Sequence, residues 1–465
     1  MPYPVLVLLI GLVTVLGLIL VLRLNAFLAL ISAAMLVSLL SPGELSVRVS
    51  RVAEAFGAAA GNIGIVIALA AVIGKCLMDS GAADRIVRSM LRALGEKRAP
   101  TALAASGYVL GVPVFFDTVF YLLVPLARSL WQKTRHNYVL YVLAIAVGAV
   151  VTHTMVPPTP GPVFMAASLG IDLGVMMLVG ALSAIPTAMV GMVAARVLSR
   201  LVDIPMRPLG DAPEPEPLDD AQLPPLWLAL LPVVLPVLLI TAKTATDAWM
   251  GTVSPEVLAS PRGELWQAVA GVAAVVGNPN LALLAAAVVA MATLKHQRRL
   301  SLAQLARSTE NALMSGGVII LITSAGGAFG AMLRASGIET TLRDWFAADG
   351  QGSGMVLLLL GFGVATLLKL AQGSGTVCMT VTAGIMAGFG TTPEVLGCHP
   401  VYLATAIGSG SVVGSWMNDS GFWIFARMSG LTEVETLKTW TVQLAILGLT
   451  SLGLTLLLAW LMPMV

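Results

Sequence analysis

The sequence is poor in charged residues. Asp, Glu, Lys and Arg make up 11% of its 465 residues, whereas 57% are hydrophobic. Soluble domains carry about 25% charged residues, so this deficit excludes a soluble globular protein. The formal net charge of +2 gives no basis for nucleic-acid binding. We therefore predict an all-α, polytopic membrane protein that is in contact with the lipid bilayer and binds no nucleic acid.

Cysteine is scarce as well, and the motifs of common hydrolases are missing. Cys76, Cys378 and Cys398 have no paired spacing, so we expect neither a disulfide framework nor a metal site. The sequence contains no HExxH or GxSxG motif, and His153 has no second histidine near it. We therefore expect neither an enzyme nor a cofactor.

Long apolar runs are abundant, and one polar segment divides them. Residues 201–225 include GDAPEPEPLDDAQLPP, which predicts a mobile, acidic, Pro-rich cytoplasmic linker. Residues 1–200 and 226–465 each contain about five predicted spans plus one re-entrant hairpin. Basic loops flank the interrupted segment Thr101–Leu130 on both sides, which favours a hairpin with its tip near Pro113–Thr118 over a full span. Ala248–Asn278 is predicted to be an outer loop or an interfacial helix.

The second part of the chain repeats the first. At an offset of 260, three residues of the first part fall on identical residues of the second, namely Gly148, Gly161 and Ala166 on Gly408, Gly421 and Ala426. An odd number of spans in each part makes the two copies opposite in orientation. Loop charges agree, because Ala82–Pro100 is basic and its counterpart Ile338–Gly354 is not. The predicted fold is therefore two inverted-topology repeats, with broken helices at the bilayer midplane.

Four segments place polar or helix-breaking residues inside apolar runs. They are Phe115–Thr118, Thr152–Pro162, Lys369–Thr376 and Ser409–Gly421. An unpaired polar group is costly in hydrocarbon, so such segments must be enclosed by protein or face water. Interrupted helices form the binding sites of many secondary transporters. An inverted repeat would bring all four segments to one central site.

The residues predicted to bind a substrate lie in these four segments. They are Asp117, Thr118, Thr152, His153, Thr154, Gly161, Gly373, Ser374, Gly375, Thr376, Ser409, Ser411, Asn418, Asp419, Ser420 and Gly421. Hydroxyl groups and helix N-termini, each with about half a positive charge, suit a small hydroxylated carboxylate. Lys369 is the nearest cation, although a lysine there also fits a side chain that extends to the membrane surface.

Coupling to protons requires a group that changes its charge state during transport. Burial disfavours the charged form of a carboxyl group, and histidine titrates near neutral pH. Asp117, His153 and Asp419 are therefore the predicted proton-coupling residues. Each also has a structural interpretation: a hydrogen bond for Asp117, a buried structural histidine for His153 and a helix cap for Asp419.

Several motifs carry a family resemblance. The segments VTHTMVPPTPGP, LKLAQGSGTV, IGSGSVVGSWMNDSGFWIFA and ETLKTWTV resemble the gluconate permease (GntP) family, and the likeness covers nearly the whole chain. The resemblance implies proton-coupled uptake of gluconate, a related sugar acid, glycerate or D-serine. It also implies a multi-pass protein of the bacterial inner membrane that forms a homodimer. The alternative function is a cation/proton (Na⁺/H⁺) antiporter built on the same superfamily scaffold.

Overall fold

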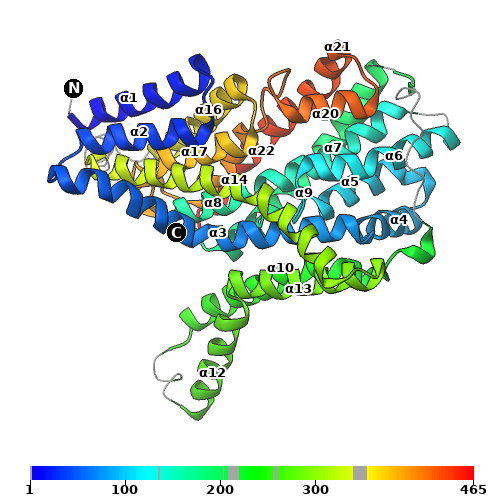
Figure 1. The fold of residues 1–465 in the computed structure, drawn as a ribbon, viewed down its shortest axis with the longest axis horizontal. Coiled ribbons are helices and arrows are strands. Elements are labelled where there is room, and N and C mark those ends of the chain that lie inside the picture. The colour runs from blue at the N-terminus through cyan, green and yellow to red at the C-terminus, as the bar shows by residue number, and fades with distance from the viewer. Residues whose placement is uncertain are drawn as a thin grey trace.

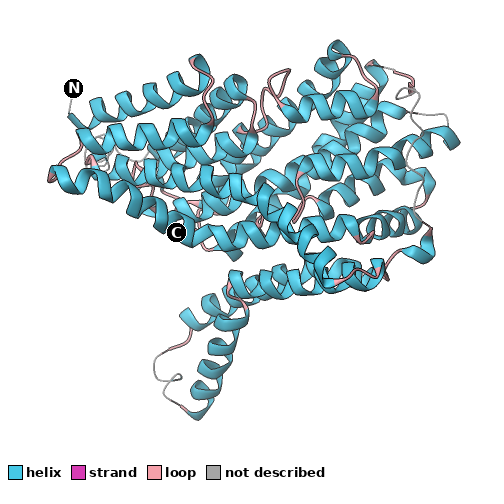
Figure 2. Ribbon diagram, viewed as in Figure 1, coloured by secondary structure: helices cyan, strands magenta, loops and turns pink. Residues whose placement is uncertain are grey.

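The computed structural model is helical wherever it shows regular structure (Figure 2). It describes residues 3–134, 137–202, 204–207, 219–254, 257, 260–338 and 353–464. The helices of the first part are α1 (Tyr3–Leu16), α2 (Ala26–Leu40), α3 (Leu45–Asp79), α4 (Ala82–Leu94), α5 (Ala99–Leu110), α6 (Phe116–Thr134), α7 (Tyr138–Met155), α8 (Pro160–Ser168) and α9 (Leu173–Leu201). Those of the second part are α10 (Leu226–Gly251), α12 (Pro261–Val276), α13 (Pro279–Arg298), α14 (Leu302–Ala335), α16 (Ser353–Gln372), α17 (Gly375–Ala387), α18 (Pro393–Leu396), α19 (Val401–Gly410), α20 (Ser420–Ser429), α21 (Glu433–Thr436) and α22 (Val442–Leu461).

The described helices confirm an all-α polytopic membrane protein. Eight of them are long and apolar enough to cross a bilayer, since about 20 residues span the hydrocarbon core. Most run side by side along the long axis of the molecule (Figure 1). The segment made of α7 and α8 is the most enclosed, with 94% of its apolar window buried, so it forms the centre of the fold.

Helices are interrupted at all four segments where the sequence predicts breaks. The gaps are residues 111–115 between α5 and α6, 156–159 between α7 and α8, 373–374 between α16 and α17, and 411–419 between α19 and α20. Gly161 and Gly421, which the offset of 260 pairs, are both the second residue of a helix that follows a gap. Each part therefore contains two interrupted helices in the same order, and the repeat itself stays a prediction.

The helices α10, α12 and α13 form an arm on one side of the body (Figure 1). The helix α12 lies at a steep angle to the others and projects outward in this view. It has 16 residues and is one of the shorter apolar helices. The predicted outer loop or interfacial helix of Ala248–Asn278 therefore contains α12, and its place relative to the membrane stays a prediction.

The described end of the linker is bound to α4 rather than detached from it. Residues 208–218 lie outside the described residues, but Asp220–Gln222 forms a short 3-10 helix. Arg85 donates to the backbone carbonyl of Pro224 at 2.7 Å, and Arg88 pairs with Asp220 at 2.7 Å. The prediction of a mobile segment therefore does not apply to residues 219–225, because these contacts fasten them to the α4 surface.

Glycines bring α5 and its hairpin into backbone contact with α7. A Cβ atom at Gly148 would lie 2.0 Å from the carbonyl oxygen of Ala104, and one at Gly107 would lie 2.9 Å from that of Ile145. At the end of α5, a Cβ atom at Gly111 would lie 2.3 Å from the hydroxyl oxygen of Thr152. No larger residue fits at these positions, so the hairpin of α5 and α6 is packed tightly against α7.

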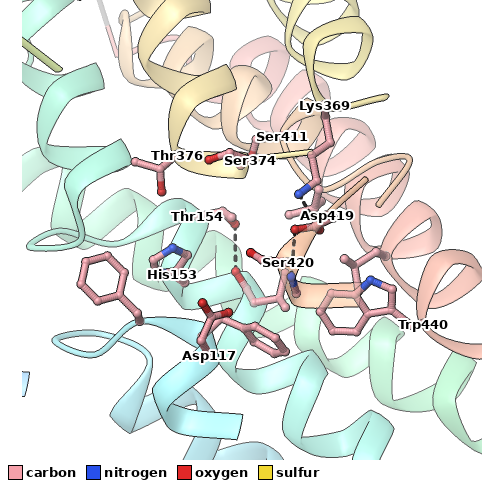
Figure 3. A pocket seen from close by; sticks show the side chains of 17 residues that line it. Asp117, His153, Thr154, Lys369, Ser374, Thr376, Ser411, Asp419, Ser420 and Trp440 are labelled. Atoms are coloured by element: carbon pink, nitrogen blue, oxygen red, sulfur yellow. Dashed lines mark hydrogen bonds and ion pairs between the residues drawn. The ribbon is translucent and has the colours of Figure 1, made fainter. Parts of the chain in front are cut away.

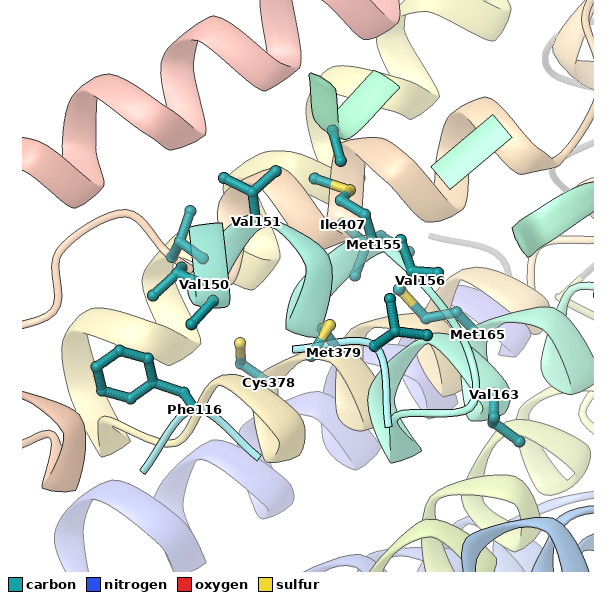
Figure 4. Close-up of a cluster of buried hydrophobic side chains, with 14 of the residues drawn as sticks. Phe116, Val150, Val151, Met155, Val156, Val163, Met165, Cys378, Met379 and Ile407 are labelled. Carbon is teal, nitrogen blue, oxygen red and sulfur yellow. The ribbon is translucent and has the colours of Figure 1, made fainter. Parts of the chain in front are cut away.

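The apolar core continues to the centre of the molecule, next to the helix breaks. Figure 4 shows Val151 and Met155 of α7 close to Cys378 and Met379 of α17 and Ile407 of α19. All five side chains are buried. Helices from both parts of the chain therefore meet at this point, and the polar residues of the breaks are supported by an apolar layer.

Candidate functional site

A small central cavity lies where the broken helices meet (Figure 3). Its volume is about 180 Å³, below the roughly 300–1,000 Å³ of pockets for drug-sized ligands. The lining residues are Phe115, Phe116, Asp117, Val150, His153, Thr154, Lys369, Ser374, Gly375, Thr376, Ser411, Val412, Asp419, Ser420, Gly421, Trp440 and Leu444. Both parts of the chain contribute, so the cavity suits a small polar solute held between them.

Three helices begin at the wall of this cavity. They are α6, α17 and α20, and the first residues of each line the space. The side chains of Ser374 and Asp419 cap α17 and α20 by accepting the backbone N–H groups of Val377 and Gly421. Free N–H groups and the partial positive charge of a helix N-terminus attract anions. The wall of the cavity is therefore suited to a negatively charged group.

A buried ion pair lies on the side of the cavity formed by the second part. The ammonium group of Lys369 is 2.7 Å from the Asp419 carboxylate, and the two residues are 4% and 6% exposed. The same ammonium donates to the backbone carbonyl of Gly373. Lys369 thus points into the protein, and the interpretation of a side chain extended to the membrane surface is wrong.

Two further residues hold the Asp419 carboxylate in place. Ser415 donates its hydroxyl proton to the Asp419 carboxylate, and the indole N–H of Trp440 donates to the Ser415 hydroxyl at 2.6 Å. Trp440 belongs to a π-helical turn, Leu437–Thr441, directly before α22, and such turns are frequent at functional sites. The carboxylate of Asp419 is therefore fully engaged by protein donors.

Asp117 and His153 lie on the other side of the cavity (Figure 3). The Asp117 carboxylate makes no hydrogen bond within the described part of the chain, and it lines the same cavity as Asp419 and Lys369. The Nδ1 atom of His153 is buried and has no hydrogen-bond partner among the described residues, and its ring lies 5.7 Å from that of Phe115. This side of the cavity therefore offers polar groups that no described protein atom satisfies.

The structure brings ten of the sixteen predicted binding residues to this cavity. They are Asp117, His153, Thr154, Ser374, Gly375, Thr376, Ser411, Asp419, Ser420 and Gly421. The hydroxyl groups of Thr376 and Ser420 make no hydrogen bond within the part of the chain that is described, so they can bind a solute. Thr154 donates to the carbonyl of Val150 in α7, and Ser411, just after α19, donates to that of Gly408, so both offer only oxygen lone pairs to the cavity.

The other six predicted residues lie outside the lining of this cavity. Thr118 lines a neighbouring cavity of about 420 Å³, and Ser409 donates to Ser451 at 2.8 Å. Asn418 donates to the carbonyl of Leu370 at 2.7 Å. These residues lie in the broken segments, but their side chains face adjacent elements.

Three of these six are packed against a neighbour. Gly373 has a φ of +85° and would clash with the carbonyl of Asn418 if it carried a Cβ atom, which would lie 2.1 Å away. Such a backbone conformation suits glycine. Gly161 packs against Met379 in the same way, and Thr152 packs against the end of α5 and donates to the Gly148 carbonyl at 3.0 Å. They shape the breaks rather than the cavity wall.

The apolar wall of the cavity is absent from the predicted set. It consists of Phe115, Phe116, Val150, Val412, Trp440 and Leu444, and the sequence signal for most of them is only their position beside a break. The sequence identifies Lys369 as the nearest cation but does not include it among the predicted binding residues. Trp440 lies in the motif ETLKTWTV, which carries the family resemblance. That motif could have marked Trp440 as a candidate, but it does not indicate a role for this residue.

Comparisons with known proteins agree with this architecture. The model of the family described as "GntP family permease" matches residues 3–461. A gluconate permease of Pseudomonas aeruginosa is 32% identical over 98% of this chain and 96% of its own length. An inner membrane permease of Escherichia coli is 30% identical over 96% of each chain. The solved YdaH transporter of Alcanivorax borkumensis shares the fold, with a TM-score of 0.65 and 16% identity over 99% of each chain.

These matches decide three predictions. The chain is a transporter and not an enzyme, because its family and its close relatives are permeases. It is a multi-pass protein of the bacterial inner membrane, as both the relatives and the eight apolar helices indicate.

Proposed function

Because the chain belongs to the GntP permease family, we propose that it is a secondary transporter that takes up a small hydroxylated carboxylate, such as gluconate or a related sugar acid, together with protons. One observation carries the proposal. Three helix N-termini, a buried lysine and free hydroxyl groups surround a single cavity that also contains an acid without a described hydrogen-bond partner. The relative from Pseudomonas aeruginosa, a gluconate permease, supports the class of solute.

The solute carboxylate is placed beside Lys369. An ammonium group has three N–H donors, and the described contacts use two of them, toward Gly373 and Asp419. The third donor and the N-termini of α17 and α20 together form a site for a carboxylate, with charge-assisted hydrogen bonds stronger than neutral ones. The hydroxyl groups of Thr376 and Ser420 then bind the hydroxyl groups of the solute.

The proton is placed on Asp117. A charged Asp117 repels a carboxylate in the same small cavity, whereas a protonated Asp117 is neutral and donates a hydrogen bond. Binding of the proton and of the anionic solute therefore favour each other by linkage. His153 lies on the same side of the cavity and serves as a second proton-binding group. Asp419 is assigned a structural part in this scheme, because Lys369 already balances its charge.

The transport cycle proposed for this site uses two inverted repeats, residues 1–200 and 226–465, joined by the cytoplasmic linker 201–225. The hairpins α5–α6 and α16–α17 re-enter the membrane from opposite sides, and the site between them opens to each side in turn. We also propose a homodimer, as the family resemblance implies. The shared order of elements in the two parts supports the repeats.

A cation/proton antiporter is the less favoured function. Sodium sites use several oxygen ligands, but the Asp419 carboxylate is already bound by Lys369, Ser415 and Gly421. Within the described residues, no cluster of three or more His, Cys, Asp or Glu side chains is present to hold a metal ion. Asp117 is thus the one acidic lining residue of the cavity that has no ion pair among the described residues.

The test uses purified protein in liposomes and labelled gluconate. For wild type we expect accumulation against a gradient when the interior is alkaline, and its loss on adding a protonophore. Asp117→Asn, which mimics the protonated acid, should retain exchange of labelled for unlabelled solute but lose proton-driven accumulation. The matched control is Asp247→Asn, which removes a carboxylate paired with Lys243 on α10. Proton-driven accumulation by Asp117→Asn would refute the coupling role of this residue.

A screen of other solutes tests which compounds bind, independently of whether transport is driven by protons. Ligands that bind the folded protein raise its melting temperature by mass action, so C3–C6 hydroxy acids, sugar acids and amino acids are compared in a thermal-shift assay. The proposal expects stabilisation by hydroxylated carboxylates and none by the matching neutral sugars or by sodium. Stabilisation by sodium alone would favour the antiporter.

A further inference from the structure

An apolar groove separates α5 from α9 on the surface of the first part. Its volume is about 810 Å³, and its walls include Ala105 and Val109 of α5 and Ile185, Met189 and Val193 of α9. Tyr108 joins the two helices at one end, where its hydroxyl donates to the carbonyl of Ala181 at 2.6 Å. The groove is separate from the central cavity and shares no lining residue with it.

The α9 wall of the groove presents apolar side chains to the surroundings. Ile185, Met189 and Val193 are 47%, 65% and 57% exposed, and they repeat every four residues along one face of the helix. The helix α9 is long and apolar enough to span the membrane. The open side of the groove therefore faces lipid, and its walls suit a hydrocarbon chain.

The other end of the groove is basic. Arg196 lines it and is exposed, as is Arg200 one turn further along α9. Thr101, near the start of α5, lines the same groove as Arg196, so the exposed Lys97 and Arg98 just before α5 lie toward the same end. None of the described side chains that line the groove is acidic. Four positive charges thus adjoin one end of an apolar channel.

We propose that this groove is a binding site for a phospholipid with an anionic headgroup. One acyl chain lies between α5 and α9, and the phosphate and headgroup lie beside Arg196, with Arg98 and Arg200 adding to the positive field. Basic residues at the membrane surface attract anionic lipids by about 1 kcal/mol each. The anionic headgroup fits the basic end of the groove, and the acyl chain fits its apolar walls. A free anion lacks the acyl chain, and a neutral lipid lacks the negative charge.

A lipid bound in this groove contacts α5, a helix that leads into the transport site. The helix α5 forms one arm of the hairpin whose break precedes Asp117, and it packs on α7 through Gly107 and Gly148. It also meets α9 at the groove, where the hydrogen bond from Tyr108 to Ala181 is a described polar link. An acyl chain in the groove fills the remaining gap between these helices, so it supports the hairpin from the lipid side.

The test is lipid retention by the purified full-length protein. The protein is incubated in detergent with equal amounts of phosphatidylglycerol and phosphatidylcholine of identical chains, and bound lipid is counted by native mass spectrometry. We expect the wild-type protein to retain more phosphatidylglycerol than phosphatidylcholine. Arg196→Gln should reduce that preference about fivefold, the factor that corresponds to about 1 kcal/mol. Arg23→Gln, which removes an exposed arginine between α1 and α2, is the matched control and should leave it unchanged.

A second variant tests the apolar half of the site. Met189→Gln places a polar group on the exposed wall of the groove and should reduce retention of both lipids, whereas Arg196→Gln affects only the anionic one. Equal retention of the two lipids by wild type would overturn the proposal. The alternative is that the groove contacts a second copy of the protein, which light scattering tests by measuring the mass of the particle. If Met189→Gln changes this mass but not the lipid content, the groove is such a contact and the lipid proposal is wrong.

Discussion

The two hairpin breaks at the centre of the molecule differ in how their charges are balanced. Beside the first break, Asp117 has neither an ion pair nor a hydrogen bond within the described residues. Beside the second, Lys369 and Asp419 neutralise each other at 2.7 Å and are both buried. The two sides of the cavity, which the sequence predicts to come from repeated units, are therefore chemically different. We infer a division of tasks in which the second wall holds the solute and the first responds to protons.

The largest expected effect comes from breaking the ion pair of the second wall. Lys369→Met leaves the Asp419 charge buried without a counter-ion, and removal of one partner of a buried pair costs about 3–5 kcal/mol. We expect a large fall in the apparent melting temperature in detergent and no stabilisation by gluconate. Asp117→Asn at the first wall should change the melting temperature little, because it breaks no described hydrogen bond.

A double variant controls for this prediction. Lys369→Met combined with Asp419→Asn removes both charges, so it should recover most of the lost melting temperature without restoring gluconate binding. If Lys369→Met and Asp117→Asn lower the melting temperature equally, the difference between the two walls does not hold.

Steric packing beside the first break should give the next largest effect. Gly148→Ala forces a Cβ atom to within 2.0 Å of the Ala104 carbonyl, and overpacking of this kind costs about 1–3 kcal/mol. In the second part, Gly408→Ala brings a Cβ atom to 2.8 Å from the Thr154 carbonyl, so we expect a smaller loss of melting temperature. Gly363→Ala, with nothing within 4 Å of its Cβ position, is the control that should be neutral or stabilising.

A moderate effect is expected from the donors behind Asp419. Trp440→Phe keeps the aromatic wall but removes the N–H donor to Ser415, and a single hydrogen bond contributes about 0.5–1.5 kcal/mol. Affinity for gluconate should fall roughly tenfold at most, while the pH dependence of accumulation remains that of wild type. A shift in the pH dependence instead would place Trp440 in proton coupling and remove the proposed division of tasks.

The smallest expected effect concerns the loop before α19, far from both walls of the cavity, since neither α19 nor α7 has a side-chain hydrogen bond from its N-cap residue. His399 lies in the loop before α19 and accepts the backbone N–H of Val401 at 3.1 Å. Burial lowers the pKa of His399 below its usual 6.5, against a smaller opposing effect of Asp172.

The sign of this pH effect follows from linkage. A lowered folded-state pKa means that the unfolded chain binds the proton more readily, so the contribution to stability is complete above about pH 6.5 and is lost as the pH falls below it. We expect the melting temperature to fall between pH 7.5 and 5.5 by a larger amount in wild type than in His399→Gln. An identical fall in both proteins would show that this histidine does not titrate on unfolding.

Much of the fold could be predicted from the sequence, because its signals are local. Long apolar runs gave the spans, and the glycines and prolines of segments such as Thr152–Pro162 gave the four breaks. The offset of 260 pairs Gly161 with Gly421, and each is the second residue of a helix that follows a break. These features depend on residues near one another in the chain, where hydrophobicity and backbone preferences act directly.

The arrangement of the site could be predicted only in part. The ion pair joins Lys369 to a residue 50 positions away, and no local pattern gives such a partner. A helix break also has more than one side, so Thr376 faces the cavity while Gly373, three residues earlier, faces the backbone of Asn418. Composition could identify the segments, but only packing decides which of their side chains face the solute.

The glycine contacts of the first hairpin have a mechanical consequence. With Gly107 and Gly148 at the α5–α7 junction and Gly111 against Thr152, α5 cannot slide along α7 without a clash of backbones. We therefore expect Asp117, at the start of α6, and His153, on α7, to keep a fixed separation. We infer that the distance from these two residues to Lys369, across the cavity that all three residues line, limits the length of the acid that can bind.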